Sequence, residues 1–385
     1  MSRKRFHPGC AAVFAVALSL VRGWCQSGAA RGALPEVLAR AESLRVAHRL
    51  DEADGMLGPY VAGHPEDVRA LGLLARIKLE EADAAGARAL LGRALEVSPN
   101  DPGANDLLGE ILLSERRYPE AMDRFETVLS TDLRDGRARS GEVAAATKLA
   151  LEARGAGRSE AALACLVHAR ENLPDDATLL LDLGILADQM RRYPGAEDAL
   201  KAALALKPGD PAILYALART ELDWQHFPEA EQRFRAYLAM KPGDATAHFG
   251  YGRMFQMQQR IPEARAEFRR SIELAPEQSE SYFEMGQMAL DAREDGEARE
   301  MFEKTLTRAP RHGGALTGMG ILAFRAGDFR AARRDLAAAV EAAPEYQQAH
   351  YFYGLTLAKL GEKAASEEQM RVATELAKQV QAKRE

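Results

Sequence analysis

Cysteine is scarce in this chain of 385 residues, which contains only Cys10, Cys25 and Cys165. The first two lie in an apolar N-terminal segment, so removal of that segment would leave Cys165 alone and no intramolecular disulfide could form. Cys165 stands close to Leu163 and Leu166, which predicts a buried and unreactive thiol. The cysteine content therefore excludes a disulfide framework.

Aromatic residues and strand patterns are also rare. Aromatic side chains make up 6% of the sequence, and no stretch alternates valine, isoleucine, threonine and aromatic residues as a β-strand does. What remains is rich in alanine, leucine, glutamate and arginine, with 28% charged residues, a composition typical of long helical proteins. The formal net charge of −6 is small and evenly spread, which argues against a nucleic acid as the partner.

Motifs that carry chemistry are missing from the sequence. There is no glycine-rich phosphate loop, no Cys-x-x-Cys pair and no His-Glu-x-x-His. The eight histidines are scattered, and His248 and His350 fall at equivalent places in a repeat, which favours ordinary packing over metal binding. We therefore expect no catalytic residue, no cofactor and no metal site, and we predict that the protein is not an enzyme.

A fixed spacing of 34 residues is what the sequence does contain. It separates Pro65 from Pro99, and it separates each member of a longer series from the next. The longer series consists of Pro174, Pro208, Pro242, Pro276, Pro310 and Pro344. A constant period of this length indicates one small supersecondary unit that is copied and stacked. Because each copy packs only on its neighbours, adding copies lengthens the chain without adding a new core. The number of domains therefore cannot be inferred from the length of the chain.

Two small residues recur in each unit. Alanine stands twelve residues before the repeated prolines, as in Ala230 and Ala264, and glycine or alanine stands ten residues after them, as in Gly252 and Gly286. These positions lie on two different predicted helices. Small side chains at both positions predict close contact between the helices.

The segment 211–244 shows how one unit is built. Leu214, Leu217, Ala218 and Leu222 recur at three- and four-residue steps and form one apolar stripe, and a second stripe follows Pro228. Proline is tolerated in the first turn of a helix because its missing N–H has no partner there. Asp244 is the expected N-cap of the next unit, as are the aspartates at the equivalent places, Asp67, Asp101, Asp176 and Asp210. Each unit is therefore predicted to be an antiparallel helix pair.

These residues resemble the tetratricopeptide repeat family. The matching motifs are Leu108-Gly109 and Leu183-Gly184 in first helices, and Tyr-Pro-Glu-Ala (118–121) and Phe-Pro-Glu-Ala (227–230) at the start of second helices. An aromatic residue or leucine follows four residues later, at Phe125, Leu200, Phe234, Phe268, Phe302 and Leu336. The resemblance covers about residues 34–380 and implies an all-α, right-handed α-solenoid of about ten stacked helix-turn-helix units. We expect the units to begin near Leu34, Val68, Pro102, Gly136, Ala177, Pro211, Ala245, Ser279, Gly313 and Gln347.

The period is interrupted once, which suggests a division of the array into residues 34–176 and 177–385. The third unit carries Leu133 where proline is expected, and the fourth extends to Pro174, seven residues beyond the period. Seven residues make nearly two helical turns, so a lengthened helix would keep its apolar face in phase. We expect residues 155–159, with Gly155, Gly157 and Ser159, to form a longer tip, and a hinge there is the alternative. At the C-terminus, Glu367, Glu368, Lys378, Lys383 and Arg384 predict a polar helix that caps the stack.

Residues 1–33 do not belong to the array. Arg3, Lys4 and Arg5 precede an uncharged run at 11–21, and small and polar residues follow as far as Ala30. This order predicts a secretory signal peptide cleaved near Ala29 or Ala30. The apolar run is about half as long as the roughly 20 residues that span a bilayer. We expect no membrane span after cleavage and an exported, periplasmic or secreted protein, with an uncleaved inner-membrane anchor as the alternative.

The predicted binding site follows from the family resemblance, which implies that first helices line a concave face and contact the ligand. Tyr215, Phe249, Phe283 and Tyr351 occupy equivalent positions there, with Thr317 interrupting, and Arg219, Arg253 and Gln287 lie one turn further along. Such a ladder of rings and cations would suit an extended peptide with apolar and acidic groups. The alternative is that the rings are partly buried against the neighbouring unit. The family's clamp for a C-terminal carboxylate needs lysine and asparagine where this chain has Asp106, Glu110, Tyr215 and Arg219, and is not predicted.

The functional prediction is a non-catalytic scaffold for protein–protein interaction, in bacterial envelope assembly or secretion. The export leader and the alanine- and arginine-rich composition motivate that compartment. The alternative is a regulatory or substrate-recruiting subunit of a separately encoded enzyme.

Overall fold

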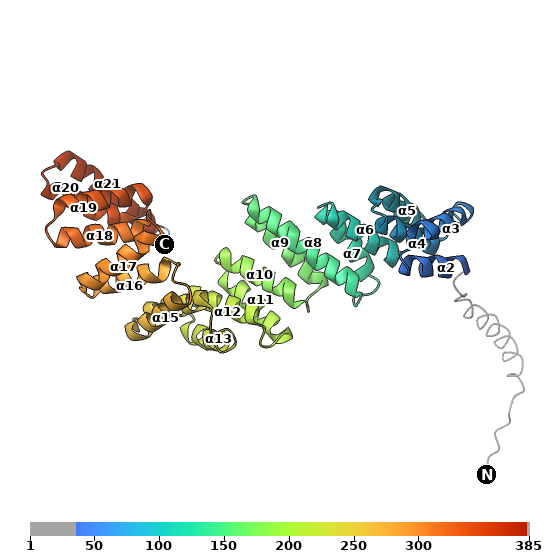
Figure 1. Cartoon of the computed structure of the whole chain (residues 1–385), viewed down its shortest axis with the longest axis horizontal. Helices are drawn as coiled ribbons and strands as arrows, with labels where there is room; N and C mark the ends of the chain where they lie inside the picture. The colour runs from blue at the N-terminus through green and yellow to red at the C-terminus, as the bar shows by residue number, and fades with distance from the viewer. Residues whose placement is uncertain (1–35, 383–385) are drawn as a thin grey trace, which may run out of the picture. The chain divides into compact units, whose positions relative to one another are not determined.

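The computed structural model describes residues 36–382, and within this range the regular secondary structure is helical throughout. Twenty helices form ten pairs, each with a first and a second helix (Figure 1). The pairs are α2 (Glu36–Val46) with α3 (Leu50–Gly63), α4 (Val68–Glu80) with α5 (Ala84–Val97), α6 (Pro102–Ser114) with α7 (Tyr118–Leu129), α8 (Gly136–Gly155) with α9 (Ser159–Asn172), α10 (Ala177–Gln189) with α11 (Tyr193–Leu206), α12 (Pro211–Asp223) with α13 (Phe227–Met240), α14 (Ala245–Met257) with α15 (Ile261–Leu274), α16 (Glu280–Asp291) with α17 (Asp295–Arg308), α18 (Gly313–Arg325) with α19 (Phe329–Ala342), and α20 (Gln347–Lys359) with α21 (Lys363–Ala382).

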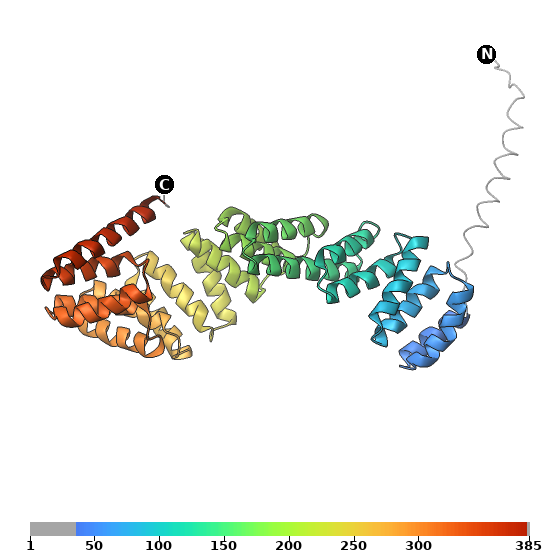
Figure 2. The same cartoon turned by 90° about the horizontal axis from the view of Figure 1, so that it is seen from above.

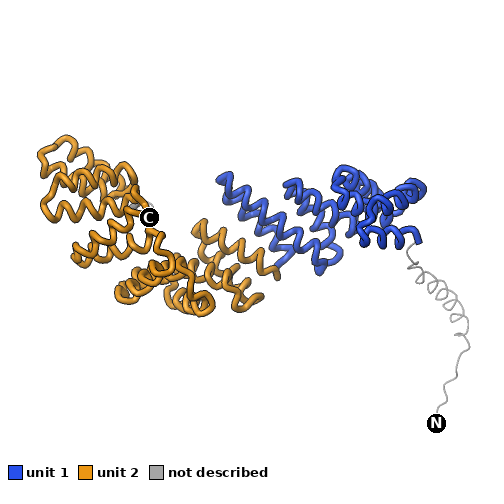
Figure 3. The backbone as a smooth tube through the Cα atoms, viewed as in Figure 1, with its two compact units in different colours: residues 1–174 blue, residues 175–385 orange. Residues whose placement is uncertain are grey.

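The predicted fold class, an all-α repeat solenoid, is confirmed. Most first helices begin at the residue predicted for the start of their repeat. Helix α2 begins two residues later than predicted and α16 one residue later. The chain divides into two compact units, the first ending at Pro174 and the second beginning at Asp175 (Figure 3). The first contains α2–α9 and the second α10–α21.

Within each unit, neighbouring helices stack in sequence order. A second helix packs on the first helix of the following pair, as α7 does on α8 and α19 on α20 (Figure 2). First helices also contact one another, as α4 does with α6 and α12 with α14. First helices of adjacent pairs therefore share one face of the stack. The α7–α8 contact shows that the first unit continues through Leu133, which is exposed.

Aspartate begins many of the first helices. Its carboxylate accepts hydrogen bonds from backbone N–H groups of the first turn, which have no partner within the helix. The predicted caps Asp67, Asp101, Asp176, Asp210 and Asp244 are confirmed, and Asp135 is a further one.

A three-residue turn joins the two helices of each pair. Its middle residue has positive φ, as at Gln225 (62°), Arg191 (57°) and Gly327 (76°). The third residue donates its backbone N–H to the carbonyl five residues earlier, as His226 does to Glu221 at 2.7 Å. This left-handed residue and hydrogen bond form the Schellman ending of a helix. The same turn in all ten pairs fixes how each second helix returns along its first helix.

The prediction of a longer tip at residues 155–159 of the fourth pair is wrong. The extra seven residues lengthen α8, which has 20 residues where most first helices have 13, and Gly155 is its last residue. The turn keeps three residues, with Gly157 at φ 73° in the left-handed position, and Ser159 opens α9. Two added helical turns keep the apolar face in phase, whereas a longer tip would leave backbone groups without partners.

Small residues allow each first helix to approach its second helix. A Cβ built on Gly286 of α16 would lie 2.8 Å from two ring carbons of Phe302 of α17, and Gly252 of α14 stands in the same relation to Phe268 of α15. Both rings are fully buried, and so are Ala264 and Ala298 on the second helices. The core of these two pairs therefore depends on a glycine of the first helix facing a large apolar side chain of the second helix.

Other predicted features fall partly outside the described residues. The predicted leader at 1–33 lies outside them, as do Lys383 and Arg384, whereas Glu367, Glu368 and Lys378 are exposed on α21. Within residues 36–382, no helix is both long and apolar enough to cross a bilayer. Cys165 is partly buried, and burial raises the pKa of its thiol to about 11, which agrees with the predicted unreactive thiol.

Replacement of Gly286 by alanine tests the packing of small residues. Gly286→Ala should lower the free energy of unfolding by about 1–3 kcal/mol, because the added methyl group forces the buried Phe302 ring to move. The midpoint of urea unfolding, followed by circular dichroism, measures the change.

Gly296→Ala on α17 is the matched control. A Cβ at Gly296 would meet nothing within 4 Å, so alanine should stabilise the helix by up to about 1 kcal/mol. Equal midpoints for the two alanine variants would contradict this account of the core.

Candidate functional site

The seven predicted binding residues lie on first helices of the second unit. Tyr215 and Arg219 belong to α12, Phe249 and Arg253 to α14, Phe283 and Gln287 to α16, and Tyr351 to α20. Each ring stands four residues after the start of its helix or, on α16, three residues after it. The repeat period therefore places the rings at one level of the stacked helices.

Four of the seven residues line one cavity. Tyr215, Arg219, Phe249 and Arg253 surround a space of about 220 Å³ between α12 and α14. Leu222, Asp223, Thr246 and Gly250 complete its lining. The structure thus brings together two rings and two guanidinium groups from adjacent pairs.

The rings are half-buried and rest on the cores of their own pairs. The Tyr215 ring centroid lies 5.2 Å from that of Tyr237 and 6.4 Å from that of Phe234, both on α13. The Phe249 centroid lies 5.7 Å from that of Phe268 on α15. Burial raises the pKa of the Tyr215 hydroxyl, so Tyr215 enters the cavity as a neutral ring. The rings therefore form a partly exposed apolar floor.

The two arginines of the cavity are exposed and have no partner. Among residues 36–382, neither the Arg219 nor the Arg253 guanidinium forms a hydrogen bond or an ion pair. The exposed Asp223 carboxylate also lies at the edge of the cavity. Burial raises the pKa of the nearby Asp188 on α10, and the positive charge of Arg219 opposes this shift. Unpaired guanidinium groups beside an apolar floor can bind carboxylates, because their N–H groups match both carboxylate oxygens.

Phe283, Gln287 and Tyr351 do not line this cavity. The Phe283 ring lies across the next pair, 4.5 Å from the His312 ring between centroids, where a Cβ on Gly314 would meet it at 2.7 Å. Gln287 donates to the Asp291 carboxylate at 3.1 Å, and Tyr351 is 39% exposed beside Phe352. Thr317, which interrupts the series of rings, is buried and donates its hydroxyl to the Gly313 carbonyl.

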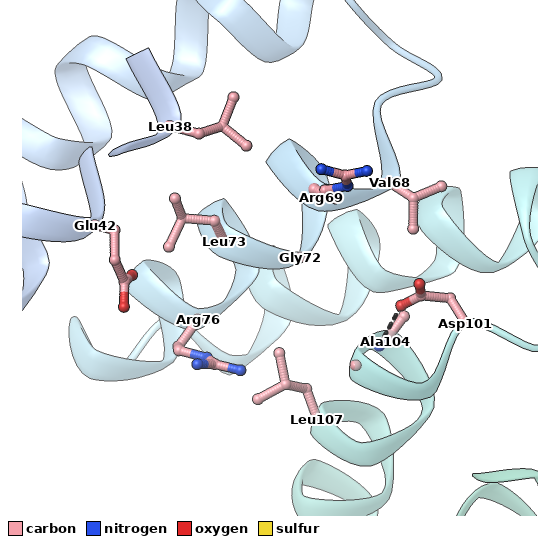
Figure 4. Close-up of a pocket in the computed structure, with 11 residues that line it drawn as sticks. Leu38, Glu42, Val68, Arg69, Gly72, Leu73, Arg76, Asp101, Ala104 and Leu107 are labelled. Carbon is pink, nitrogen blue, oxygen red and sulfur yellow. Dashed lines mark hydrogen bonds between the residues drawn. The ribbon is translucent and has the colours of Figure 1, made fainter. Parts of the chain in front are cut away.

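Sequence reasoning missed Leu222, Asp223, Thr246 and Gly250. Thr246 lies three residues before Phe249, and Leu222 three residues after Arg219, so helical spacing places them on the same faces as the predicted residues. It also missed a cavity in the first unit lined by Gly72 and Arg76 (Figure 4), which stand at the places in α4 that Phe249 and Arg253 occupy in α14. The repeat period could have identified Gly72 and Arg76, since they occupy the same positions in their repeat as Phe249 and Arg253 do in theirs.

A buried carboxylate, Glu221, directly precedes the cavity residue Leu222 on α12. Glu221 is fully buried, neither of its carboxylate oxygens has a hydrogen-bond partner within the described chain, and the nearest cation is Arg233 of α13, 3.7 Å from Oε1. Burial raises the pKa of Glu221 to about 7, although Arg233 opposes this shift. A carboxyl group in this position favours the protonated form, so the folded state binds its proton more tightly than the unfolded chain does.

The part of the chain that the structure describes, residues 36–382, has no cluster of three or more histidine, cysteine, aspartate or glutamate residues that could hold a metal ion.

Family models for the tetratricopeptide repeat match most of the chain. They cover residues 78–142, 147–211, 215–279, 258–313 and 317–379. The chain belongs to the tetratricopeptide repeat family. Repeats of this family generally bind proteins or peptides, so the array is a repeat scaffold for protein interactions. No curated protein matches the sequence.

Several solved structures are similar to this chain. A tetratricopeptide repeat protein from Parabacteroides merdae is 16% identical with a TM-score of 0.50, and the match covers 61% of this chain and 93% of that one. PilF from Pseudomonas aeruginosa is 19% identical with a TM-score of 0.49, covering 57% and 99%. PilW, described as a type IV pilus biogenesis factor, is 21% identical with a TM-score of 0.47, covering 52% and 93%.

Replacement of Glu221 tests the cost of its burial. Its pKa is raised in the folded state, so stability should fall as pH rises from about 4.5 to about 7 and stay lower above that range. Glu221→Gln should therefore raise the free energy of unfolding by about 1–3 kcal/mol at pH 8 and leave it nearly unchanged at pH 4.5.

Thermal melts of both proteins across this pH range measure the difference. Glu303→Gln, at an exposed position on α17, is the control and should change stability by less than about 0.5 kcal/mol at either pH. A Glu221→Gln variant less stable than the parent at pH 8 would show that the Glu221–Arg233 attraction outweighs burial.

Proposed function

We propose that the protein is a non-catalytic scaffold that binds an extended segment of a partner protein on the first helices of its second unit. The observation that carries this proposal is the pair of exposed, unpartnered guanidinium groups, Arg219 and Arg253, beside the half-buried Tyr215 and Phe249 rings. Phe283, Gln287 and Tyr351 extend the proposed surface along α16 and α20.

The proposed partner segment carries apolar and acidic side chains. Its apolar groups would cover the exposed edges of Tyr215 and Phe249, which gains the free energy of removing apolar surface from water. Its carboxylates would pair with Arg219 and Arg253, which form no hydrogen bond and no ion pair within residues 36–382, although Asp223 and Asp188 lie nearby. A charge-assisted hydrogen bond of this kind contributes about 1.5–3 kcal/mol. An acidic, partly apolar segment therefore fits better than a basic or wholly polar one.

The proposed setting is the bacterial envelope, in assembly or secretion. The support is the N-terminal sequence, in which Arg3, Lys4 and Arg5 precede the apolar run at 11–21. An exported scaffold would meet its partner after the leader has been removed.

Removal of the two charges tests the binding surface. Arg219→Gln combined with Arg253→Gln should weaken partner binding at least about tenfold, because two carboxylates lose their cations. The melting temperature should stay nearly the same, since both side chains are exposed and without partners in the described chain. Affinity capture from envelope extracts, followed by a titration with the captured partner, measures the loss.

The matched control carries Arg269→Gln and Arg299→Gln, which remove two exposed arginines from the second helices α15 and α17. It changes the net charge by the same amount and should retain the partner. Equal capture by both double variants would reject the cavity as the binding site.

The leader makes a separate prediction. The mature N-terminus of protein isolated from its native host should begin after about residue 25 to 31. N-terminal sequencing gives the answer directly. A chain that starts at Met1 or Ser2 and stays in the membrane fraction would instead establish an uncleaved anchor.

A further inference from the structure

A fully buried carboxyl group lies in the fourth pair, at a position that is leucine, methionine or tyrosine in the other repeats. Glu142 is the seventh residue of α8 and is fully buried. The equivalent residues of the other first helices from α4 onward are Leu74, Leu108, Leu183, Leu217, Tyr251, Met285, Met319 and Tyr353. A carboxyl group in place of such a side chain costs free energy unless it is hydrogen-bonded.

Helix α9 holds one oxygen of this carboxyl group. Asn172, the last residue of α9, donates from Nδ2 to Glu142 Oε1 at 2.9 Å. Glu142 Oε2 is buried and has no hydrogen-bond partner within residues 36–382. A neutral carboxyl group can accept this hydrogen bond through its carbonyl oxygen, whereas an ionised one would place a buried charge beside a single donor. The closed pair of helices therefore favours the protonated form of Glu142.

Three charged groups act on Glu142 besides the Asn172 amide. Glu126 of α7 and His168 of α9 face each other, with 2.9 Å between Glu126 Oε1 and His168 Nε2. Arg139 lies one turn before Glu142 on α8 and also donates to a backbone carbonyl at 3.2 Å. Burial dominates over these groups and raises the pKa of Glu142 to about 7.

The other titratable groups packed around α8 have different neighbours. Cys165 of α9 lies with its thiol 3.7 Å from the Ala146 carbonyl, one turn beyond Glu142. Glu171 of α9 lies 3.9 Å from His168 Nδ1. On α6, Asp106 interacts with Glu110, Asp135, Arg137 and Arg76. The charge on Glu142 is therefore opposed only by Arg139 and by a protonated His168.

Helix α9 depends mainly on α8 for its place in the first unit. It is the last helix of that unit, and its tertiary contacts there are chiefly with α8 (Figure 1). Its buried face is short and consists of Ala162, Leu163, Leu166 and Ala169. The hydrogen bond from Asn172 to Glu142 and the ion pair of His168 with Glu126 add two polar contacts. The ion pair exists only while the imidazole is protonated.

We propose that Glu142 is a pH-sensitive latch, which holds α9 on α8 while its carboxyl group is protonated and favours opening of α9 once it ionises. Opening transfers the carboxylate from the interface to water, so ionisation stabilises the open form relative to the closed one. Because the pKa is raised in the closed form, the stabilisation of that form is complete below about pH 4.5 and is lost as the pH rises through about 7. Loss of the His168 proton removes its attraction to Glu126 and acts in the same direction.

Hydrogen exchange of the purified protein, followed by mass spectrometry, tests the latch. Peptides from α9 are compared with peptides from α3 and α19 at pH 6 and pH 8, after each rate is divided by the intrinsic rate at that pH. The parent protein is compared with two variants. Glu142→Gln keeps an oxygen that accepts from Asn172 but cannot ionise. Glu96→Gln is the matched control, because it removes an exposed carboxylate from α5 of the same unit.

Opening of α9 should increase about tenfold from pH 6 to pH 8 in the parent protein and in Glu96→Gln. This factor follows from a pKa of about 7 for Glu142 in the closed form and about 4.5 for an exposed glutamate. Glu142→Gln should remove most of the increase, and the peptides from α3 and α19 should change far less.

Three results would overturn the proposal. Opening of α9 could be the same at both pH values, or it could increase equally in the parent protein and in Glu142→Gln. Stronger protection of α9 at pH 8 would show that Asn172 and Arg139 stabilise the ionised carboxylate. Equal changes in α3, α9 and α19 would show that the effect belongs to the whole protein. None of these results bears on the capture test with Arg219 and Arg253, which concerns the second unit.

Discussion

The contact between a small residue of a first helix and a large apolar residue of its second helix is the constraint on which the fold depends. Gly252 faces Phe268 and Gly286 faces Phe302, at distances where a methyl group would overlap the ring. This contact brings the two backbones close enough for the three-residue turn to join them. Once each pair is fixed, its outer faces pack on the neighbouring pairs and the stack extends without a central core.

The same constraint explains why the sequence predicted the fold so closely. The small residues, the capping aspartates and the repeated prolines each mark one place in the unit, and the observed helix starts follow them. The added residues of the fourth pair were predicted to form a loop, because Gly155, Gly157 and Ser159 favour one, but they are helical. The turn needs only one residue with positive φ, and Gly157 supplies it, so the added residues were free to become two helical turns of α8.

The candidate site was less predictable, because equivalent positions do not have equivalent surroundings. Tyr215 and Phe283 occupy equivalent positions in the repeat, each in the second turn of a first helix. Tyr215 faces a following helix with Thr246 in its first turn, and a cavity remains beside it. Phe283 faces Gly314 and the His312 ring, and it lies across them. A period fixes which residues are neighbours, whereas the size of each neighbour decides whether the space between them is open.

Stability and the proposed recognition depend on different residues of the same helix. The glycines and alanines that face the second helix cannot grow without moving a buried ring. The residues that directly follow two of them, Arg219 and Arg253, are exposed, form no hydrogen bond and no ion pair in the described chain, and can change with little effect on the core. The half-buried rings contribute to the core and also line the cavity, since Phe249 packs against Phe268 and faces the cavity between α12 and α14. Substitution of a ring should therefore change stability and the proposed binding together, whereas substitution of an exposed arginine should change the proposed binding with far less change to the fold.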